Sequence, residues 1–220
     1  MTAALPDEGD ILDWGCGHGL VALLAAEERP GRSVVGADID VDKLETARRA
    51  ATAAGFGDRV TFWDLVDGEL PVGTWDAVAI VDMLYLLAPD AQEQLVHEAA
   101  ACLAPGGVLV VKDLDDRPRL KAWLAAVQEA ISVRVTRITA TADGLHRPPG
   151  PARVERWMAA AGLATERQPC HRGHHVPHVL VVGTKPTVDQ AGAPRRTTDA
   201  LTLVHLCMAV LSESGGTFPF

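Results

Sequence analysis

Basic residues are in short supply in this chain of 220 residues. Its 20 lysines and arginines stand against 29 aspartates and glutamates, which gives a formal net charge of −9. Proteins that bind a nucleic-acid backbone usually carry a basic surplus on one face, so the composition argues against a nucleic-acid partner. We expect a small-molecule ligand instead.

Long apolar runs are also missing. No stretch approaches the roughly 18 consecutive apolar residues of a membrane-spanning helix, and the amino terminus lacks the basic segment and apolar run of a signal peptide. We therefore expect no membrane insertion and a cytoplasmic location. Overall, 48% of the residues are apolar and 22% are charged, proportions that are typical of a folded globular chain.

Paired cysteines are the third absence. The chain has four cysteines without a CxxC pair, at Cys16, Cys102, Cys170 and Cys207. Such scattered thiols indicate a reducing compartment rather than a disulfide framework, and each of them is expected to behave as a small buried apolar residue.

Short apolar runs alternate with amphipathic stretches over the first half of the chain, and this alternation predicts βαβ units around a parallel sheet. Five strands are expected, at Ile11–Trp14, Ser33–Ala37, Arg59–Trp63, Trp75–Val81 and Gly107–Lys112. Helices are expected between them at His18–Arg29, Val41–Ala54 and Pro89–Leu103.

The second half is expected to complete the same domain. A helix is predicted from Asp116 to about Ile131, and three prolines and two glycines make Gly144–Pro151 a loop. A helix at Arg153–Ala161 and strands at Leu163–Arg167 and Val176–Thr184 follow. We assign residues 1–185 to this domain. Residues 186–220 are expected to be a linker and a short apolar helix that docks on the domain or mediates self-association.

The stretch "ILDWGCGHG", from Ile11 to Gly19, places three alternating glycines directly after the first strand. A dinucleotide-binding loop would have a third glycine where Leu20 stands, and a phosphate-binding P-loop would continue with Gly-Lys-Ser/Thr. Neither pattern is present. In an open parallel sheet this first strand-to-helix turn lies where ligands bind.

The pattern D-x-G-x-G-x-G resembles the first motif of the class I S-adenosylmethionine-dependent methyltransferases. The resemblance implies that Asp13 engages the cationic amino group of S-adenosylmethionine. It also implies that the loop approaches the methionine half of this cofactor and offers backbone amides to it. The loop residues predicted to bind the cofactor are Gly15, Cys16, Gly17 and Gly19.

Two further acids extend the resemblance. Asp38 ends the second strand in "VVGADID", where a carboxylate can accept hydrogen bonds from both ribose hydroxyls, and Ile39 is placed to pack on the adenine. Asp64 in "VTFWDLV" stands where the family often has an acid at the adenine amino group, with the Leu65 amide directed to the ring. A turn or helix-cap role for Asp64 is the alternative. A typical member has glycine where this chain has Trp63.

The later strands match in order. "WDAVAIVDMLYLL" runs into Asp82 and Tyr85 as the family's fourth motif does, and "LAPGGVLVVKD" is similar to its next signature. Asp82 is expected to contact the cofactor. The resemblance implies a doubly wound α/β fold of the Rossmann-like methyltransferase type. Its seven-stranded sheet is mostly parallel, and the last strand runs antiparallel between the fifth and the sixth.

Methyl transfer from a sulfonium is an in-line displacement, so the enzyme mainly aligns the acceptor and excludes water. A general base helps when the acceptor is a hydroxyl. Candidates for that base are Asp82, Tyr85, Asp113, Asp115, His146 and the histidines of "CHRGHHVPH", His174 among them. The same histidines could bind an acceptor or cap a hairpin. A metal role is not expected, because methyl transfer requires no metal.

Members of the family usually carry a helical segment ahead of the first strand, whereas about ten residues precede Ile11 here. The start could lie further upstream, a homo-oligomer or partner subunit could supply a lid, or the carboxyl-terminal residues could substitute. The expected function is methylation of a small molecule, at oxygen in preference to nitrogen or carbon. The alternatives are a catalytically inactive or partner-dependent cofactor-binding member and an NAD-dependent oxidoreductase.

Overall fold

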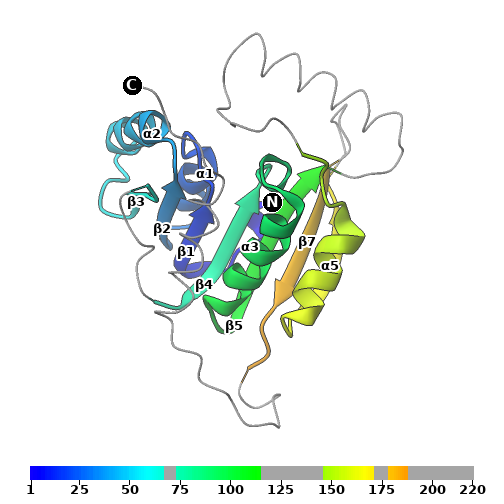
Figure 1. Ribbon diagram of the computed structural model, residues 1–220. Helices are drawn as coiled ribbons and strands as arrows, with labels where there is room; N and C mark the ends of the chain where they lie inside the picture. Colours follow the sequence, from blue (N-terminus) through cyan, green and yellow to red (C-terminus); the bar gives the residue numbers. More distant parts are fainter. Residues whose placement is uncertain (67–72, 115–145, 171–177, 188–220) are drawn as a thin grey trace.

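A computed structural model describes residues 1–66, 73–114, 146–170 and 178–187 (Figure 1). The strands are β1 (Glu8–Trp14), β2 (Gly31–Asp38), β3 (Val60–Asp64), β4 (Trp75–Val81), β5 (Leu103–Leu114), β6 (Ala164–Pro169) and β7 (His178–Thr184). The helices are α1 (Leu20–Glu28), α2 (Val41–Ala53), α3 (Pro89–Ala101) and α5 (Pro151–Ala160). Two short 3₁₀ turns, η1 (Thr2–Ala4) and η2 (Leu84–Leu86), complete these elements.

The seven strands form one sheet in the order β3-β2-β1-β4-β5-β7-β6. Strands β1 to β5 pair in parallel, and β7 runs antiparallel to both β5 and β6. The predicted fold class and the predicted place of the antiparallel strand are thereby confirmed. Strand order reverses between β1 and β4, and this is where an open α/β sheet binds its ligand.

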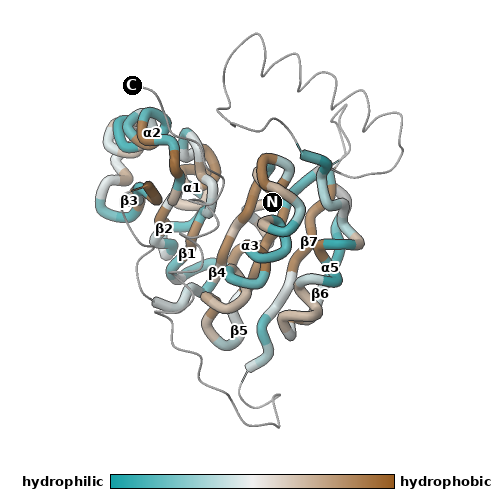
Figure 2. The backbone as a smooth tube through the Cα atoms, in the orientation of Figure 1, coloured by the Kyte–Doolittle hydropathy of each residue, from teal (hydrophilic) through white to brown (hydrophobic). Residues whose placement is uncertain are grey.

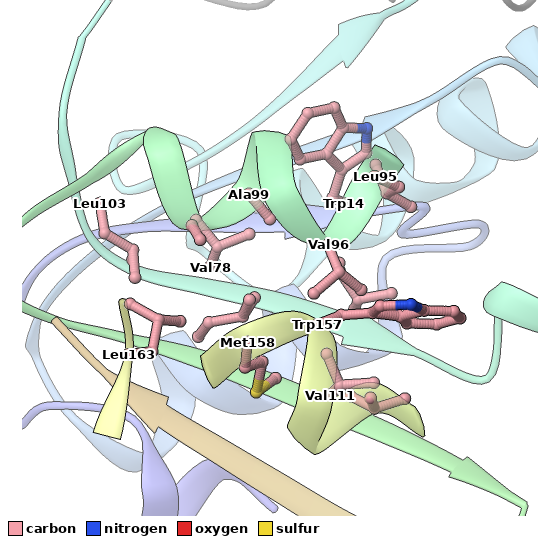
Figure 3. Close-up of a cluster of buried hydrophobic side chains, with 14 of the residues drawn as sticks. Trp14, Val78, Leu95, Val96, Ala99, Leu103, Val111, Trp157, Met158 and Leu163 are labelled. Atoms are coloured by element: carbon pink, nitrogen blue, oxygen red, sulfur yellow. The ribbon is translucent and has the colours of Figure 1, made fainter. Parts of the chain in front are cut away.

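Each face of the sheet carries its own apolar core. Successive residues of a strand point to opposite faces, so Leu12 belongs to the core that includes α3 and α5 while its neighbour Ile11 belongs to the core that includes α1 and α2. Figure 3 shows the first core, in which Trp157 and Met158 of α5 meet Val96 of α3. In Figure 2 the central strands are mainly apolar, as expected for strands that helices cover on both faces of the sheet. Helix α2 is mainly polar.

The observed elements differ from the predictions mainly at their ends. The first helix was expected from His18 but begins at Leu20, because Gly19 has a left-handed backbone (φ +75°) that cannot start a helix. Strand β5 begins at Leu103 and includes the proline-glycine turn that was expected to precede it. The helix predicted from Asp116 to Ile131 lies outside the described residues, as do residues 188–220.

Arg32 is a buried cation that the sequence patterns did not single out. Its side chain, on β2, is 1% exposed and donates to four backbone carbonyls. These acceptors are Thr2 O (3.0 Å), Leu5 O (3.2 Å), Pro6 O (2.7 Å) and Ala25 O (3.1 Å). Glu28 of α1 lies 3.7 Å from the guanidinium. Arg32 therefore joins the amino-terminal segment to α1 and to the sheet.

Replacing Arg32 by methionine is expected to lower the free energy of unfolding by about 3 kcal/mol or more. The substitution keeps much of the apolar volume but leaves buried carbonyls without donors, and each such group costs about 1–3 kcal/mol. Urea unfolding of Arg32→Met measures the loss, and Arg49→Met, which removes an exposed arginine of α2, is the control. A loss no larger than that of the control would show that these hydrogen bonds add nothing to stability.

Within the ranges that the structure describes, no helix has the length and apolar character needed to cross a membrane.

Candidate functional site

The predicted site residues gather at one edge of the sheet, where the parallel strands end. Asp13 precedes the loop after β1, Asp38 ends β2, and Asp64 ends β3. Asp82 directly follows β4. The antiparallel β7 starts at this edge, since His178 pairs with Leu114 at the end of β5. The ends of these strands therefore share one edge of the sheet.

The three glycines of the loop have different surroundings, although all have positive φ values (+79°, +51° and +75°). A Cβ atom on Gly15 would meet Met83 at 2.8 Å, and one on Gly19 would meet the ring of Phe62 at 2.6 Å. A Cβ atom on Gly17 would meet no atom closer than Lys43 Cδ at 3.9 Å, an ordinary van der Waals distance. Gly15 and Gly19 are thus required by packing, whereas Gly17 leaves room for a ligand.

The backbone amides of this loop are already engaged. Gly15 and Cys16 both donate to Ala37 O, at 2.8 and 3.1 Å, and Gly19 donates to Cys16 O at 2.9 Å. The Gly17 amide donates to Asp38 Oδ2 at 2.7 Å. The expectation that the loop offers its amides to a ligand does not hold for these four groups in this conformation. The carboxyl groups of Asp13 and Asp38 flank the loop, which favours a ligand rich in donors.

Asp13 is a buried carboxyl group, 1% exposed. Neither of its oxygens has a hydrogen-bond partner of ordinary geometry among the described residues. Burial raises the pKa of Asp13 from 3.8 to about 7, and the nearby Ala22 amide counteracts part of that rise. A buried acid without a donor is costly for the protein alone, so its position directly before the loop points to a cationic group of a ligand.

Asp38 holds the loop and remains able to accept more hydrogen bonds. Its Oδ2 accepts from Gly17 and its Oδ1 accepts from the amide of Asp40 at 2.9 Å. A carboxylate has about four lone-pair sites, so two are left for a diol. The role predicted for Asp38 is compatible with this geometry, and the residue has a second task in shaping the loop.

Asp64 lies beside Asp38 in the sheet register, and its Oδ1 accepts from the Val66 amide at 2.8 Å. Asp64 thus has the turn role that was its alternative. The Leu65 amide donates to Asp38 O at 3.0 Å, so its predicted contact with an adenine ring would compete with that bond. Ile39 and Trp63, 50% and 40% exposed, leave apolar surface near these acids.

Cys16 is not set up as a reactive thiol. It is partly buried, and its thiol lies 3.8 Å from Gly17 O. Burial, reinforced by the charges of Asp13 and Asp38, raises the pKa of this thiol. The group stays protonated at neutral pH, and Cys16 contributes packing at the base of the loop.

On the other side of the site, Asp82 contacts residues of two further strands. Its Oδ2 pairs with Lys112 Nζ of β5, and its Oδ1 lies 3.5 Å from His178 Nδ1 of β7. Burial acts to raise the pKa of Asp82, but His178 and the Lys112 charge outweigh it and hold the pKa below its ordinary value. Asp82, one of the base candidates, is therefore ionised at neutral pH and is a weak proton acceptor.

Tyr85 and His146, two other base candidates, are brought together through the backbone. The His146 amide donates to Tyr85 O at 2.8 Å. Gln92, fully buried on α3, donates to Leu87 O and Arg147 O and so fixes the same loop. The loop that carries His146 is thus held at the η2 turn, next to Asp82.

Some predicted residues lie elsewhere. Asp113 is 3% exposed on β5. His174 and Asp115 lie outside the described residues, together with His171 and His175. Sequence reasoning missed Met83, which covers Gly15, and Lys112, whose only signal was a lysine at the end of an apolar strand. The part of the chain that the structure describes contains no group of three side chains that could hold a metal.

Comparisons with known proteins find similarity to methyltransferases. A family model described as a methyltransferase domain matches residues 11–107. The demethylmenaquinone methyltransferase of Thermus thermophilus is 32% identical over 164 residues, which cover 70% of this chain and 74% of that protein. The nocamycin O-methyltransferase of Saccharothrix syringae is 31% identical over 171 residues, 72% of this chain and 60% of that one.

A relative of another kind is the tRNA1(Val) (adenine(37)-N6)-methyltransferase of Porphyromonas gingivalis, 31% identical over 58% of each chain. Among solved structures, an O-methyltransferase family protein from Burkholderia thailandensis has a TM-score of 0.65 at 19% identity. That match covers 81% of this chain and 51% of the other, and it reflects the shared fold. Apart from the Thermus protein, these relatives are matched over less than two thirds of their length.

Proposed function

This chain belongs to the class I S-adenosylmethionine-dependent methyltransferase family, and from this premise we propose that it transfers a methyl group from S-adenosylmethionine to an oxygen of a small-molecule acceptor. The observation that supports the proposal is the glycine loop after β1. Carboxyl groups flank this loop, and four of its backbone amides already donate hydrogen bonds within the protein. When bound, S-adenosylmethionine supplies an electrophilic methyl group on its sulfonium sulfur.

The chemistry of the loop separates this ligand from a dinucleotide. A pyrophosphate is bound by free backbone N–H groups at a helix start, and an adjacent buried carboxylate would repel it. S-adenosylmethionine has no phosphate, and it brings an ammonium group and two ribose hydroxyls as donors. Asp13 can accept from the ammonium and Asp38 from the hydroxyls. The NAD-dependent alternative is disfavoured for this reason.

The remaining contacts follow from the positions of the residues. Ile39 offers apolar surface for the adenine, and Asp64 has an oxygen besides the one in its turn. Gly17 provides the closest approach for the ligand, because a side chain there would occupy open space. These residues bind and orient the ligand. Transfer to the acceptor depends on residues beyond β4.

The acceptor is proposed to be a small molecule because the net charge of −9 opposes a polyanionic partner. A tRNA acceptor is the second candidate, favoured by the tRNA-methylating relative. Closure of the site by a homo-oligomer or a partner subunit remains part of the proposal. A cofactor-binding member without turnover is the remaining alternative, since the names of the relatives do not establish activity here.

Calorimetry with S-adenosylhomocysteine and with NADH tests the cofactor. We expect the first to bind and the second not to bind. Asp38→Ala should weaken S-adenosylhomocysteine binding by about 1–3 kcal/mol, through lost charged hydrogen bonds and a looser loop. Asp58→Ala, which removes an exposed acid, is the control. Preferential NADH binding, or unchanged affinity in Asp38→Ala, would overturn the assignment.

Labelled methyl transfer tests the acceptor. Protein and S-adenosylmethionine carrying a labelled methyl group are incubated separately with the small-molecule fraction and the tRNA fraction of a bacterial extract. We expect label in the first fraction, at an oxygen. Label confined to tRNA would select the second candidate, and cofactor binding without label in either fraction would favour an inactive member.

A further inference from the structure

A cluster of three charged or ionisable side chains lies on the acceptor side of the site, one from each of three neighbouring strands. Asp82 follows β4, Lys112 belongs to β5 and His178 begins β7. The Asp82 carboxylate pairs with the Lys112 ammonium through one oxygen and lies 3.5 Å from His178 Nδ1 through the other. All three side chains are partly buried, with exposed fractions of 38%, 19% and 21%.

The backbone is bent to build this cluster. Asp82 has φ +51°, and it is the sole non-glycine residue with a positive φ among those described. Aspartate tolerates this left-handed conformation better than most residues with a side chain. The Asp82 amide donates to Lys112 O at 2.9 Å, which ties the bend to β5. From this bend the Asp82 carboxylate contacts Lys112 and His178.

The charges assign different tasks to the three groups. Asp82 stays ionised, because its two partners hold its pKa low. It can orient an imidazole and stabilise an imidazolium, but it is a poor base. With Nδ1 directed to Asp82, Nε2 is the ring nitrogen that can accept a proton. Lys112 is a cation that can bind a developing oxyanion.

We propose that this cluster receives an acceptor with an ionisable hydroxyl group, a phenol or an enol, and converts it to its oxyanion. The proposal rests on the proposed function and names its substrate class. His178 takes the proton, Lys112 binds the oxygen, and Asp82 is a positioning residue. With the proton on His178, two cations face two anions, so the cluster is electrically balanced once the acceptor is ionised.

The step balances in atoms and electrons. The O–H bond of the acceptor breaks and its proton passes to His178 Nε2. The oxygen lone pair then forms a bond to the methyl carbon as the carbon–sulfur bond of S-adenosylmethionine breaks. S-adenosylhomocysteine leaves with that electron pair, and the proton on His178 returns to solvent. No oxidant, reductant or metal is consumed.

Two charged side chains of the described residues lie near His178. Asp82, after β4, is 3.5 Å from its Nδ1, and Lys112 of β5 pairs with the same carboxylate. Directly after β6, the Cys170 amide donates to His178 O at 3.0 Å. Asp113 neighbours Lys112 in the chain but falls on the opposite face by strand alternation. Proton transfer at His178 is therefore governed by Asp82 and Lys112.

The probe for this proposal is 4-nitrophenol, whose anion absorbs visible light, so that its ionisation is read without turnover. It is titrated into the protein saturated with S-adenosylhomocysteine. A cation within hydrogen-bond reach lowers the pKa of an acid by about one unit or more. We therefore expect the ratio of bound phenolate to phenol to rise about tenfold over free solution at the same pH.

His178→Ala and Lys112→Met should each abolish most of this rise, while Lys112→Arg, which keeps the charge, should retain part of it. Asp82→Asn should move the ionisation of the bound probe to higher pH, because the imidazolium loses its partner. Arg49→Met removes an exposed positive charge of α2 and should leave the rise unchanged. Circular dichroism confirms that each variant is folded.

The proposal is overturned if the probe ionises no more readily with the protein than in free solution, or if Lys112→Met and His178→Ala ionise it as well as the unchanged chain does. Calorimetry with S-adenosylhomocysteine separates this failure from failure of the proposed function. A chain that binds S-adenosylhomocysteine but does not ionise the probe keeps its cofactor and loses this substrate class. A chain that binds no S-adenosylhomocysteine contradicts the proposed function. The 4-nitrophenol titration is then carried out without S-adenosylhomocysteine.

Discussion

Substitution of Gly17 by alanine is expected to abolish measurable S-adenosylhomocysteine binding while the chain remains folded. A Cβ at this position meets no protein atom closer than 3.9 Å, so the side chain would project into the space assigned to the ligand. The positive φ of +51° adds a strain of about 1–2 kcal/mol, which lowers stability without unfolding a typical domain. Affinity should fall by at least about 100-fold, or ~3 kcal/mol.

Gly55→Ala is the matched control for backbone strain. Gly55 follows α2, has φ +75°, and like Gly17 would accept a Cβ without a clash. Both variants should lose a similar free energy of unfolding, measured by urea titration, whereas calorimetry should find binding lost in Gly17→Ala alone. Normal affinity in a folded Gly17→Ala protein would refute the placement of the ligand. Gly15 and Gly19 are unsuitable for this test, because substitution there collides with Met83 or Phe62.

The sequence was sufficient to predict which glycines belong to the loop, but it could not separate their tasks. The alternation of Gly15, Gly17 and Gly19 is a local pattern, and it correctly located a turn after the first strand. Whether a glycine is needed for a ligand or for a neighbouring side chain depends on residues far along the chain. Phe62 reaches the loop from β3, and Met83 reaches it from beyond β4.

The same limit applied to the acceptor side. The parallel strands followed from apolar runs and the place of the antiparallel β7 from the family resemblance, and both are confirmed. The association of Lys112 with Asp82 depends on β4 and β5 lying side by side with Val81 opposite Lys112, which no spacing in the sequence reveals. Asp82 was a candidate base because an acid near a site often is one. Its partners lower its pKa, which makes the carboxylate a weak proton acceptor.

Asp13→Asn is expected to raise the stability of the free protein at alkaline pH and to weaken its binding of S-adenosylhomocysteine. Both effects come from one cause, the burial of a carboxyl group without a donor of ordinary geometry among the described residues. Asparagine has nearly the shape of the protonated acid and carries no charge. The variant therefore resembles the protonated protein at every pH, while the unchanged chain must ionise a buried group.

The direction of the pH effect follows from linkage. The folded-state pKa of Asp13, about 7, lies above its ordinary value of 3.8. Between these values the folded state holds a proton that the unfolded state has released, so stability falls as pH rises through this window. The loss is complete above the folded pKa and amounts to at most about 4 kcal/mol, at ~1.36 kcal/mol per unit. Urea unfolding at pH 4 and pH 8.5 should show this decline, and Asp13→Asn should lack it.

Ligand binding should reverse this cost and release a proton. An ammonium group beside Asp13 favours the carboxylate, so binding at pH 6 must displace the proton that the buried acid holds. Calorimetry in buffers of different ionisation enthalpy should detect about one proton released per S-adenosylhomocysteine at pH 6 and none at pH 8.5, since the folded pKa is about 7. Asp13→Asn should release none at either pH and bind more weakly. If the unchanged chain binds the ligand at pH 6 without releasing a proton, Asp13 does not receive the ammonium, and the cationic end of the ligand must lie elsewhere along the loop.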